Sequence, residues 1–418
     1  MTRGGSISVN GRTYEWPARP LVVICVDGCE PDYLTQAYAA GAMPYLAPTA
    51  AAGASLIGAS VVPSFTNPNN LSIVTGVSPA VHGICGNYFW DRDAGAEVMM
   101  NDPKYLRCDT ILAAFAQAGA TVAVVTAKDK LRRLLGTGCA GSASRRSRRT
   151  RSTRPSTESR TCWGWWGCPL PSVYSADLSE FVFAAGVKLM ESARPDILYL
   201  STTDYIQHKH APGTAQANDF YRMMDSYLAR LDALGATIAI TADHGMNAKT
   251  DANGAPQVIY LQDVLDGWLG AGRARVILPI TDPYVVHHGA LGSFATVYLP
   301  EGVSARAAAP SVAALPGMDL VLDREEGCRR FELPPDRMGD LIAVSGRHTV
   351  IGTSAAKHDL SGLDAPSALT AGFRSSRCPR VQPAHRRQAV AAPAPQLRHL
   401  RSRPQPRPVM SVLATLAW

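Results

Sequence analysis

The sequence predicts an α/β fold with a mostly parallel central sheet flanked by helices. Short apolar runs rich in β-branched residues alternate along the chain with segments of helical periodicity. Near-continuous apolar strands separated by helices are typical of a parallel sheet that is buried on both faces. With 418 residues, 46% of them hydrophobic and 18% charged, the chain can bury a large globular core.

The first predicted strand is LVVICVDG at residues 21–28, which ends in Asp-Gly. The alternation of helix and strand then continues, and each strand leads into a loop that carries polar residues. The elements expected after the first strand are a helix over 108–119, a strand over 121–127, a helix near 178–193, a strand over 196–204, a helix over 215–234 and a strand over 236–245.

The chain between residues 262 and 350 has a different pattern from the rest. Four short strand signals, ARVILPI, FATVYLP, MDLVLD and LIAVSG, are separated by glycine and proline. We therefore predict a smaller cap over 262–350, inserted between a catalytic core over 1–261 and a return to that core over 351–418.

Charge and composition exclude several classes of protein. The net charge is +7, but residues 138–168 contain seven Arg and residues 367–418 contain nine, with no Lys in either stretch. The rest of the chain is net negative, so the basic balance does not indicate a nucleic-acid-binding face. No apolar run is long enough for a membrane span, and the first residues do not resemble a signal peptide. Together with nine irregularly spaced cysteines, this predicts a cytoplasmic protein.

Three acidic residues follow predicted strands that lie far apart in the sequence. Asp27, Asp204 and Asp243 each stand at a carboxyl end, where ligands bind in parallel sheets. His208 lies one helical turn after Asp204, and His244 follows Asp243 directly. Each feature alone has a simpler reading, as a turn residue or a surface pair on a helix. Together their oxygen and nitrogen donors predict a zinc site.

The motifs around these residues resemble the alkaline phosphatase superfamily, in its nucleotide pyrophosphatase and phosphonoacetate hydrolase branch. The matching segments are V-D-G at 26–28, S-F-T-N-P-N at 64–69, T-G-x-x-P-x-x-H-G at 75–83, D-x-x-x-H at 204–208, D-H-G at 243–245 and LPPDRMGDLIAVS at 333–345. HGICGNYFWD, TAKDKLRRLLG and PSVYSADLSEFVFAAGVKL resemble phosphonoacetate hydrolases more specifically. The resemblance covers most of residues 20–365.

The resemblance implies an alkaline-phosphatase-like sandwich that binds two zinc ions and hydrolyses a carbon–phosphorus bond. It places the catalytic nucleophile at Thr66, whose hydroxyl would be activated by zinc. Without the neighbouring motifs, Thr66 would read as a buried turn hydroxyl. The implied ligands of one zinc are Asp27, Thr66, Asp243 and His244, and those of the other are Asp204 and His208.

The implied substrate is phosphonoacetate, a small-molecule phosphonate that would yield acetate and phosphate. Because acetate is a poor leaving group, cations near its carboxylate would help, and Lys128 and Lys130 fit that role. Asn87 could donate to a phosphonate oxygen. The two lysines could also belong to a solvated loop. A homo-oligomer is possible, and His82, His210, His287 and His288 are expected in the core or on the surface rather than as ligands.

Two alternative functions remain open at this point. The same metals would serve a phosphodiesterase or nucleotide pyrophosphatase. The chain could also be an inactive relative, because the branch normally supplies a further histidine in an H-G-G or H-G-S segment near the C-terminus. This chain has LTAGF at 369–373, so position 370 is threonine.

The two Arg-rich stretches have the composition of a GC-rich gene read out of frame. One choice of codons for residues 369–379 gives HGGVSEQPVP in another frame, with a histidine in place of Thr370. Residues 141–147 and 162–168 can likewise be shifted to ICFSAE and LGLVGM. We therefore predict that 138–168 and the chain from about 367 are frame-shifted; genuine divergence or a basic linker is the alternative.

Overall fold

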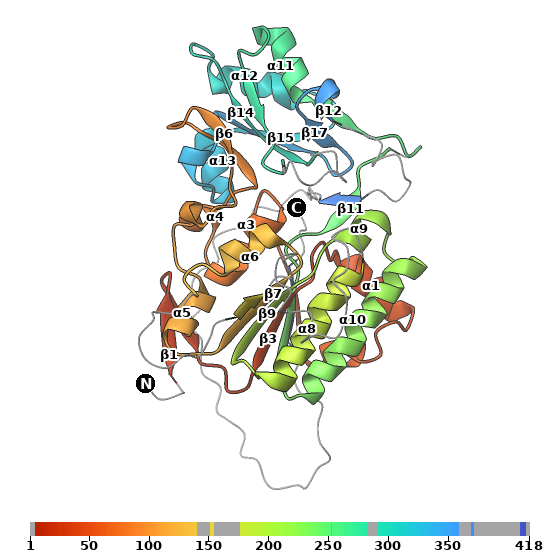
Figure 1. The fold of residues 1–418 in the computed structure, drawn as a ribbon. Helices are drawn as coiled ribbons and strands as arrows, with labels where there is room; N and C mark the ends of the chain where they lie inside the picture. Colours follow the sequence, from red (N-terminus) through yellow and green to blue (C-terminus); the bar gives the residue numbers. More distant parts are fainter. Residues whose placement is uncertain are drawn as a thin grey trace, which may run out of the picture.

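A computed structural model describes residues 5–139, 151–153, 176–251, 253–281, 291–358, 369–371 and 410–414. Most of the two Arg-rich stretches, His287 and His288 lie outside these residues. Two bodies are visible in Figure 1, a lower one around a parallel sheet and an upper one around an antiparallel sheet. No helix in the described part of the chain combines the length and apolar character that a membrane-spanning helix requires.

The lower body contains a seven-stranded sheet in which every described pair of neighbours is parallel. The predicted α/β fold is therefore confirmed. β3 lies at the centre of the sheet, between β10 and β9, so the three strands that precede the acidic residues are adjacent. In sheet order the strands are β4 (Ala54–Gly58), β19 (Met410–Ala414), β10 (Thr237–Thr241), β3 (Leu21–Cys25), β9 (Ile197–Ser201), β7 (Val122–Thr126) and β8 (Arg151–Thr153).

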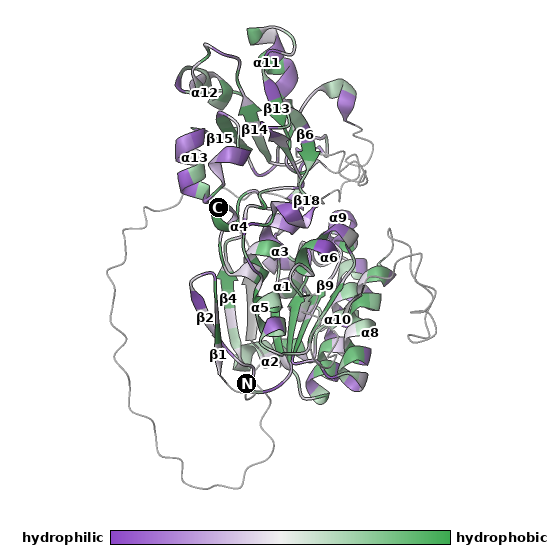
Figure 2. Ribbon diagram, turned by 60° about the vertical axis from the view of Figure 1, so that its left-hand side comes forward, coloured by the Kyte–Doolittle hydropathy of each residue, from purple (hydrophilic) through white to green (hydrophobic). Residues whose placement is uncertain are grey.

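Helices cover both faces of this sheet, and the alternation of strand side chains explains why. Val22 and Ile24 of β3 belong to one buried core with α1, α8 and α10, whereas Cys25 belongs to a second core with α3, α5 and α6. The two layers are seen on either side of the sheet in Figure 1, and the strands are largely hydrophobic in Figure 2. The helices are α1 (Pro31–Ala39), α2 (Leu46–Ala52), α3 (Thr66–Thr75), α4 (Pro79–His82), α5 (Ile111–Gln117), α6 (Asp129–Leu135), α8 (Asp177–Ser192), α9 (Tyr205–Lys209) and α10 (Ala215–Ala233).

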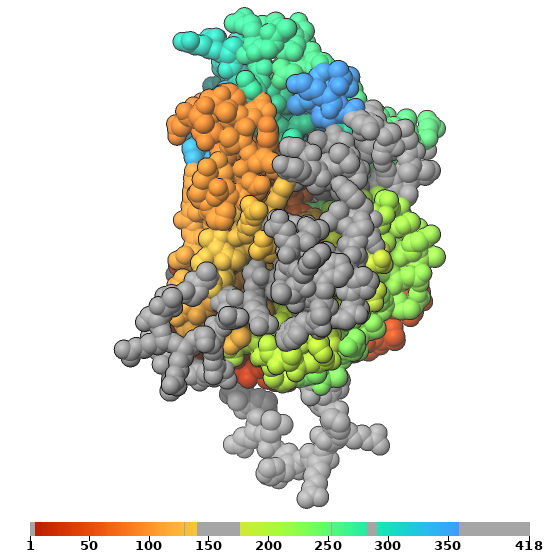
Figure 3. All heavy atoms as spheres, viewed as in Figure 1, coloured from red at the N-terminus to blue at the C-terminus, as the bar shows by residue number. Residues whose placement is uncertain are grey.

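The upper body is built on a four-stranded antiparallel sheet, to which the four short strand signals between 262 and 350 contribute. The β5–β6 hairpin packs beside it, with the Arg275 guanidinium 3.9 Å from the centre of the Trp90 ring. In Figure 3 the region that includes this hairpin, in orange, lies directly against the green and teal atoms of the upper body. The elements are β5 (Tyr88–Asp91), β6 (Ala96–Met99), α11 (Leu261–Leu269), β13 (Arg275–Ile277), β14 (Phe294–Tyr298), α12 (Ala305–Ala313), β15 (Met318–Asp323), α13 (Arg324–Phe331) and β16 (Leu341–Ser345).

Short two-stranded pairings complete the described chain. β1 (Ser6–Val9) and β2 (Arg12–Glu15) form a hairpin, and β12 (Val258–Tyr260) pairs with β17 (Val350–Gly352). β11 (Met246–Ala248) pairs antiparallel with β18 (Leu369–Ala371), which returns the chain to the lower body. The division at residues 261 and 350 stays a prediction, and the structure adds the β5–β6 hairpin to the neighbourhood of the cap sheet.

Candidate metal and catalytic site

The register of the parallel sheet brings the three predicted acidic residues together. Cys25 of β3 is level with Thr241 of β10 and with Ser201 of β9. Asp27 and Asp243 each follow two residues after these positions, and Asp204 follows three residues after its strand position. Their side chains therefore emerge at the same edge of the sheet, as expected for carboxyl ends of neighbouring parallel strands.

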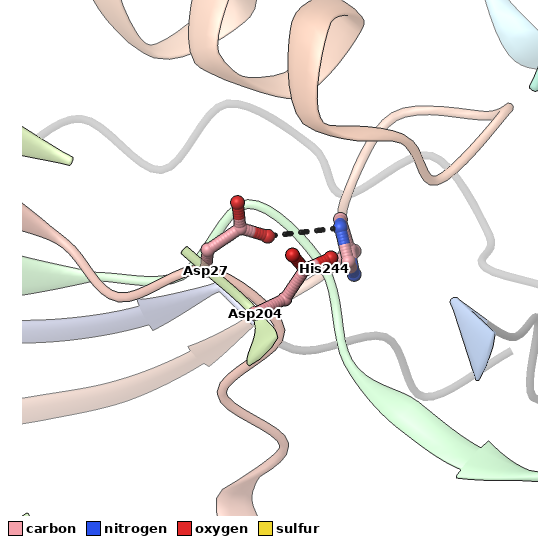
Figure 4. A group of neighbouring side chains, drawn as sticks. All are labelled: Asp27, Asp204 and His244. Atoms are coloured by element: carbon pink, nitrogen blue, oxygen red, sulfur yellow. Dashed lines mark ion pairs between the residues drawn. The ribbon is translucent and has the colours of Figure 1, made fainter. Parts of the chain in front are cut away.

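Figure 4 shows that Asp27, Asp204 and His244 point toward one another. One possible ligand atom from each lies within 4.8 Å of the others, and all three residues are buried. The Nε2 atom of His244 lies 3.3 Å from Oδ1 of Asp27. A cluster of two carboxylates and an imidazole at this spacing has the donor set that zinc binds.

The remaining predicted ligands contact this group. His208 stands at the fourth position of α9, and its Nε2 lies 3.1 Å from Oδ2 of Asp204. Asp243 accepts hydrogen bonds at Oδ1 from the backbone N–H of Gly28, at 3.2 Å, and of His244, at 3.0 Å. These contacts link residues from three strand ends into one buried network.

Thr66 enters the site as the first residue of α3. Its Oγ1 accepts a hydrogen bond from the Lys128 ammonium at 3.0 Å. Lys128 follows β7, and its Nζ forms ion pairs with Asp27 and, at 3.3 Å, with Asp204. The ammonium therefore lies between two predicted zinc ligands and the predicted nucleophile.

The electrostatics of the site favour a cation. Burial disfavours the charged form of Lys128, but the carboxylates of Asp204, Asp27 and Asp243 outweigh burial and raise the pKa of this ammonium above its usual range. Burial, together with the nearby Asp27 carboxylate, raises the pKa of Asp243 to about 7. Three buried carboxyl groups thus share one small volume, and positive charge placed among them stabilises their ionised forms.

The residues present also fit a metal ion by their hydrogen bonding. Among the described residues, neither side-chain oxygen of the fully buried Asp27 accepts a backbone N–H, and both face the Lys128 ammonium or the His244 ring. Buried carboxylate oxygens that lack hydrogen-bond donors are costly unless a cation compensates them. The oxygen and nitrogen donors match those that zinc accepts.

Asn87 is tied to the start of α3. Its Oδ1 accepts a hydrogen bond from Nδ2 of Asn67 at 2.9 Å, and its Nδ2 donates to the carbonyl of Ile280 at 3.3 Å. The Asn87 amide therefore lies next to Asn67, the residue that follows Thr66.

Lys130 is the second residue of α6 and is half-buried. The substrate contacts of Asn87, Lys128 and Lys130 stay predictions.

The described histidines outside the ligand set have other surroundings. His82 is buried, accepts the Ile84 backbone N–H at Nδ1 and lies 2.9 Å from the Ser72 hydroxyl through Nε2. Burial lowers the pKa of His82 to about 3, so it is a neutral core residue. The carbonyl of His210 accepts a hydrogen bond from the Tyr33 hydroxyl.

Asn70 is a site residue that the sequence reasoning missed. It is fully buried on α3 and donates to Oδ2 of Asp243 at 3.1 Å. The available signal was the run Asn67-Pro-Asn69-Asn70, because asparagine is a poor former of helix interiors and proline is tolerated only in the first turn. Three buried asparagines at the start of one helix indicate that their side chains form hydrogen bonds there and do not simply fill space.

Gly28 allows the tight turn that carries Asp27. Its φ angle is +69°, in the left-handed region, and a Cβ atom there would lie 3.1 Å from Cγ of Met246 and 3.3 Å from Cβ of Asp204. Only glycine satisfies both the backbone and the space.

An alanine in the left-handed region costs roughly 1–2 kcal/mol of stability. Replacing Gly28 with alanine should destabilise the metal-free protein by more than this, because Met246 and Asp204 must also move. It should also weaken zinc binding. Gly11→Ala is the matched control, since Gly11 has a φ of +74° with nothing within 4 Å of the added Cβ. Chemical denaturation and zinc titration of both variants check this. Equal losses of stability would contradict the crowding argument.

A family model described as type I phosphodiesterase / nucleotide pyrophosphatase matches residues 21–369, which is most of the chain. The chain belongs to this family. The match includes every predicted ligand and both bodies of the fold. The predicted resemblance to this branch of the alkaline phosphatase superfamily is therefore confirmed.

Two solved structures of one relative have the same residue as this chain at more than half of the compared positions. Phosphonoacetate hydrolase from Sinorhizobium meliloti in complex with phosphonoformate is 56% identical, with 89% of this chain and 91% of that chain covered and a TM-score of 0.82. The same values hold for its complex with phosphonoacetate. Murine ectonucleotide pyrophosphatase / phosphodiesterase 5 is 17% identical, with 85% of this chain and 84% of that chain covered and a TM-score of 0.55, and it shares the fold.

Proposed function

We propose that this family member hydrolyses the carbon–phosphorus bond of phosphonoacetate to give acetate and phosphate. The observation that carries the proposal is the 56% identity, over nine-tenths of both chains, to a phosphonoacetate hydrolase. The clustering of Asp27, Asp204 and His244 beside Thr66 and Lys128 supports it. The partner is a small-molecule phosphonate, and a cytoplasmic location and any homo-oligomer stay predictions.

The residues that would hold zinc form two groups, one that includes Asp27 and one that includes Asp204. Asp27, Thr66, Asp243 and His244 would hold one ion, and Asp204 and His208 the other. When bound, zinc would supply positive charge that favours ionisation of a hydroxyl and stabilises negative charge on phosphonate oxygens. The division between two ions follows the resemblance to the family, and the donor set and the buried negative charge of the site support zinc binding here.

Thr66 would act as the nucleophile. Its Oγ attacks phosphorus, the carbon–phosphorus bond breaks, and the electron pair of that bond moves to the methylene carbon and its carboxylate. The carbon takes up one proton, which balances the proton lost by the Thr66 hydroxyl, and acetate leaves. Water then hydrolyses the threonine phosphate ester and releases phosphate. The position of Thr66 at the first turn of α3 supports this role, because a helix N-terminus favours negative charge.

Lys128 and Asn87 would position the dianionic substrate. The Lys128 ammonium already lies within hydrogen-bond distance of Thr66 Oγ1, so its charge is available beside the attacking hydroxyl. Asn87 would donate to a phosphonate oxygen. Lys130 would add a second positive charge near the carboxylate of the substrate.

The second candidate function is hydrolysis of a nucleotide diester, which the family description favours. Relative rates separate the two. With zinc added, the chain should release phosphate from phosphonoacetate at least about tenfold faster than it releases nitrophenol from a nitrophenyl nucleotide diester, a difference of about 1.4 kcal/mol in transition-state binding. The reverse order of rates would replace the proposed substrate by a diester.

A further inference from the structure

A chain of buried hydrogen bonds leads from the central sheet to Asp243. The Tyr199 hydroxyl on β9 donates to Oδ1 of Asn70 at 2.8 Å. Nδ2 of Asn70 donates to Oδ2 of Asp243 at 3.1 Å and to the backbone carbonyl of Thr66 at 3.0 Å. All three side chains are at most 1% exposed.

The partners of Asn70 fix the orientation of its amide. The Thr66 carbonyl and the Asp243 carboxylate can only accept, so the NH₂ group of the amide must face them. The amide oxygen then faces Tyr199, whose hydroxyl can donate. The opposite orientation would place the amide oxygen against two acceptors and lose two hydrogen bonds, each worth more in a buried site than at the surface.

This arrangement in turn constrains the Asp243 carboxylate. Its Oδ1 accepts the backbone N–H groups of Gly28 and His244. A carboxylate oxygen has about two acceptor positions, so Oδ1 is saturated. Asn70 takes one position of Oδ2 and leaves the other, and the His244 ring lies on that side of the carboxylate, with Nε2 3.9 Å from Oδ2.

We infer that Asn70 and Tyr199 are positioning residues that hold Asp243 with a single acceptor position directed at the metal site. Asn70 also couples Asp243 to the nucleophile, because it bonds the backbone carbonyl of Thr66. The inference rests on the proposed assignment of Asp243 as a zinc ligand. It goes beyond that assignment by naming the residues that set the orientation of the ligand.

The test measures the zinc affinity of the purified chain by competition with a chelator of known affinity. Asn70→Leu keeps the number and branching of the side-chain heavy atoms but removes the amide, and it should weaken the tighter zinc site by about 10–100-fold, the usual effect of a lost partner of a metal ligand. Tyr199→Phe should weaken it by about tenfold, which corresponds to one hydrogen bond. The double variant should be no weaker than Asn70→Leu alone, because Tyr199 acts only through Asn70.

Asn69→Leu is the matched control. Asn69 is buried on the same helix and bonds only backbone groups in the described chain, the carbonyl of Phe65 and the N–H of Val61. The Asn69→Leu variant should lower the melting temperature of the metal-free chain about as much as Asn70→Leu does. When Asn69→Leu is combined with Tyr199→Phe, the effects of the two substitutions on zinc affinity should add.

Unchanged zinc affinity in Asn70→Leu, or additive losses in the double variant with Tyr199→Phe, would overturn the inference. If the unaltered chain binds zinc and cleaves the nitrophenyl nucleotide diester but not phosphonoacetate, the proposed substrate fails while the positioning role stands. If the unaltered chain binds no zinc, both fail.

Discussion

Thr66→Ala should lower the rate of phosphate release from phosphonoacetate by about 10⁴-fold or more, the scale seen when a covalent nucleophile is removed. Most of the bound zinc should remain, because Asp27, Asp243 and His244 still provide three ligands, the number that a catalytic zinc site requires. Phosphate assays and metal analysis of the same preparation measure both quantities.

Two further variants sharpen the result for Thr66. Thr66→Ser keeps a hydroxyl and should retain measurable turnover. Thr75→Ala is the matched control, because Thr75 is a buried threonine at the other end of α3 whose hydroxyl bonds only the Leu71 carbonyl in the described chain. It should lose stability but keep the rate. Retained turnover in Thr66→Ala would show that water or another residue attacks phosphorus.

Thr370→His together with Ala371→Gly should raise the zinc content from about one ion per chain toward two, and phosphate release should rise with it. Asp204 and His208 alone are fewer than the three protein ligands that zinc sites usually have. The backbone places position 370 well for a third ligand. β18 pairs with β11 so that Thr370 is opposite Asn247, three residues after His244, and β18 also lies beside α9, which carries His208.

A residue that only hydrogen-bonds to a metal ligand contributes roughly 10–100-fold to metal affinity. The added histidine should raise the zinc affinity of the second site by at least that factor. Ala96→His is the control, since it adds an imidazole to an exposed position of the β5–β6 hairpin. Equilibrium dialysis against zinc, followed by metal analysis, measures the stoichiometry. If the double variant binds no more zinc than the control, both the ligand assignment and the predicted reading-frame shift around residue 370 are wrong.

The strand ends could be predicted from the sequence because each apolar run stops there at polar residues. LVVICVDG becomes β3 and places Asp27 at the carboxyl edge, and ATIAITADHG does the same for Asp243 and His244. The order of strands in the sheet could not be predicted from these patterns, because pairing between distant segments depends on packing that no local pattern records. The adjacency of β9, β3 and β10 is therefore a structural finding.

The contacts that other site residues make could not be predicted from the sequence. Lys128 was predicted to bind substrate, but its ion pairs with Asp27 and Asp204 depend on the turn after β7. Asn70 directly follows the S-F-T-N-P-N motif that contains Thr66, and its link to Tyr199 joins residues 129 positions apart. Contacts of that separation follow from the tertiary fold alone. The β5–β6 hairpin likewise joins the upper sheet through Arg275, which sequence order does not indicate.

The most direct measurement is the release of phosphate and acetate from phosphonoacetate by the Thr370→His/Ala371→Gly protein, as a function of added zinc. The account predicts equal amounts of the two products, a rate that rises as the second zinc binds, and loss of the reaction when Thr66→Ala is added to the same protein. No release at any zinc concentration, or release that is unaffected by zinc and by Thr66→Ala, would contradict it.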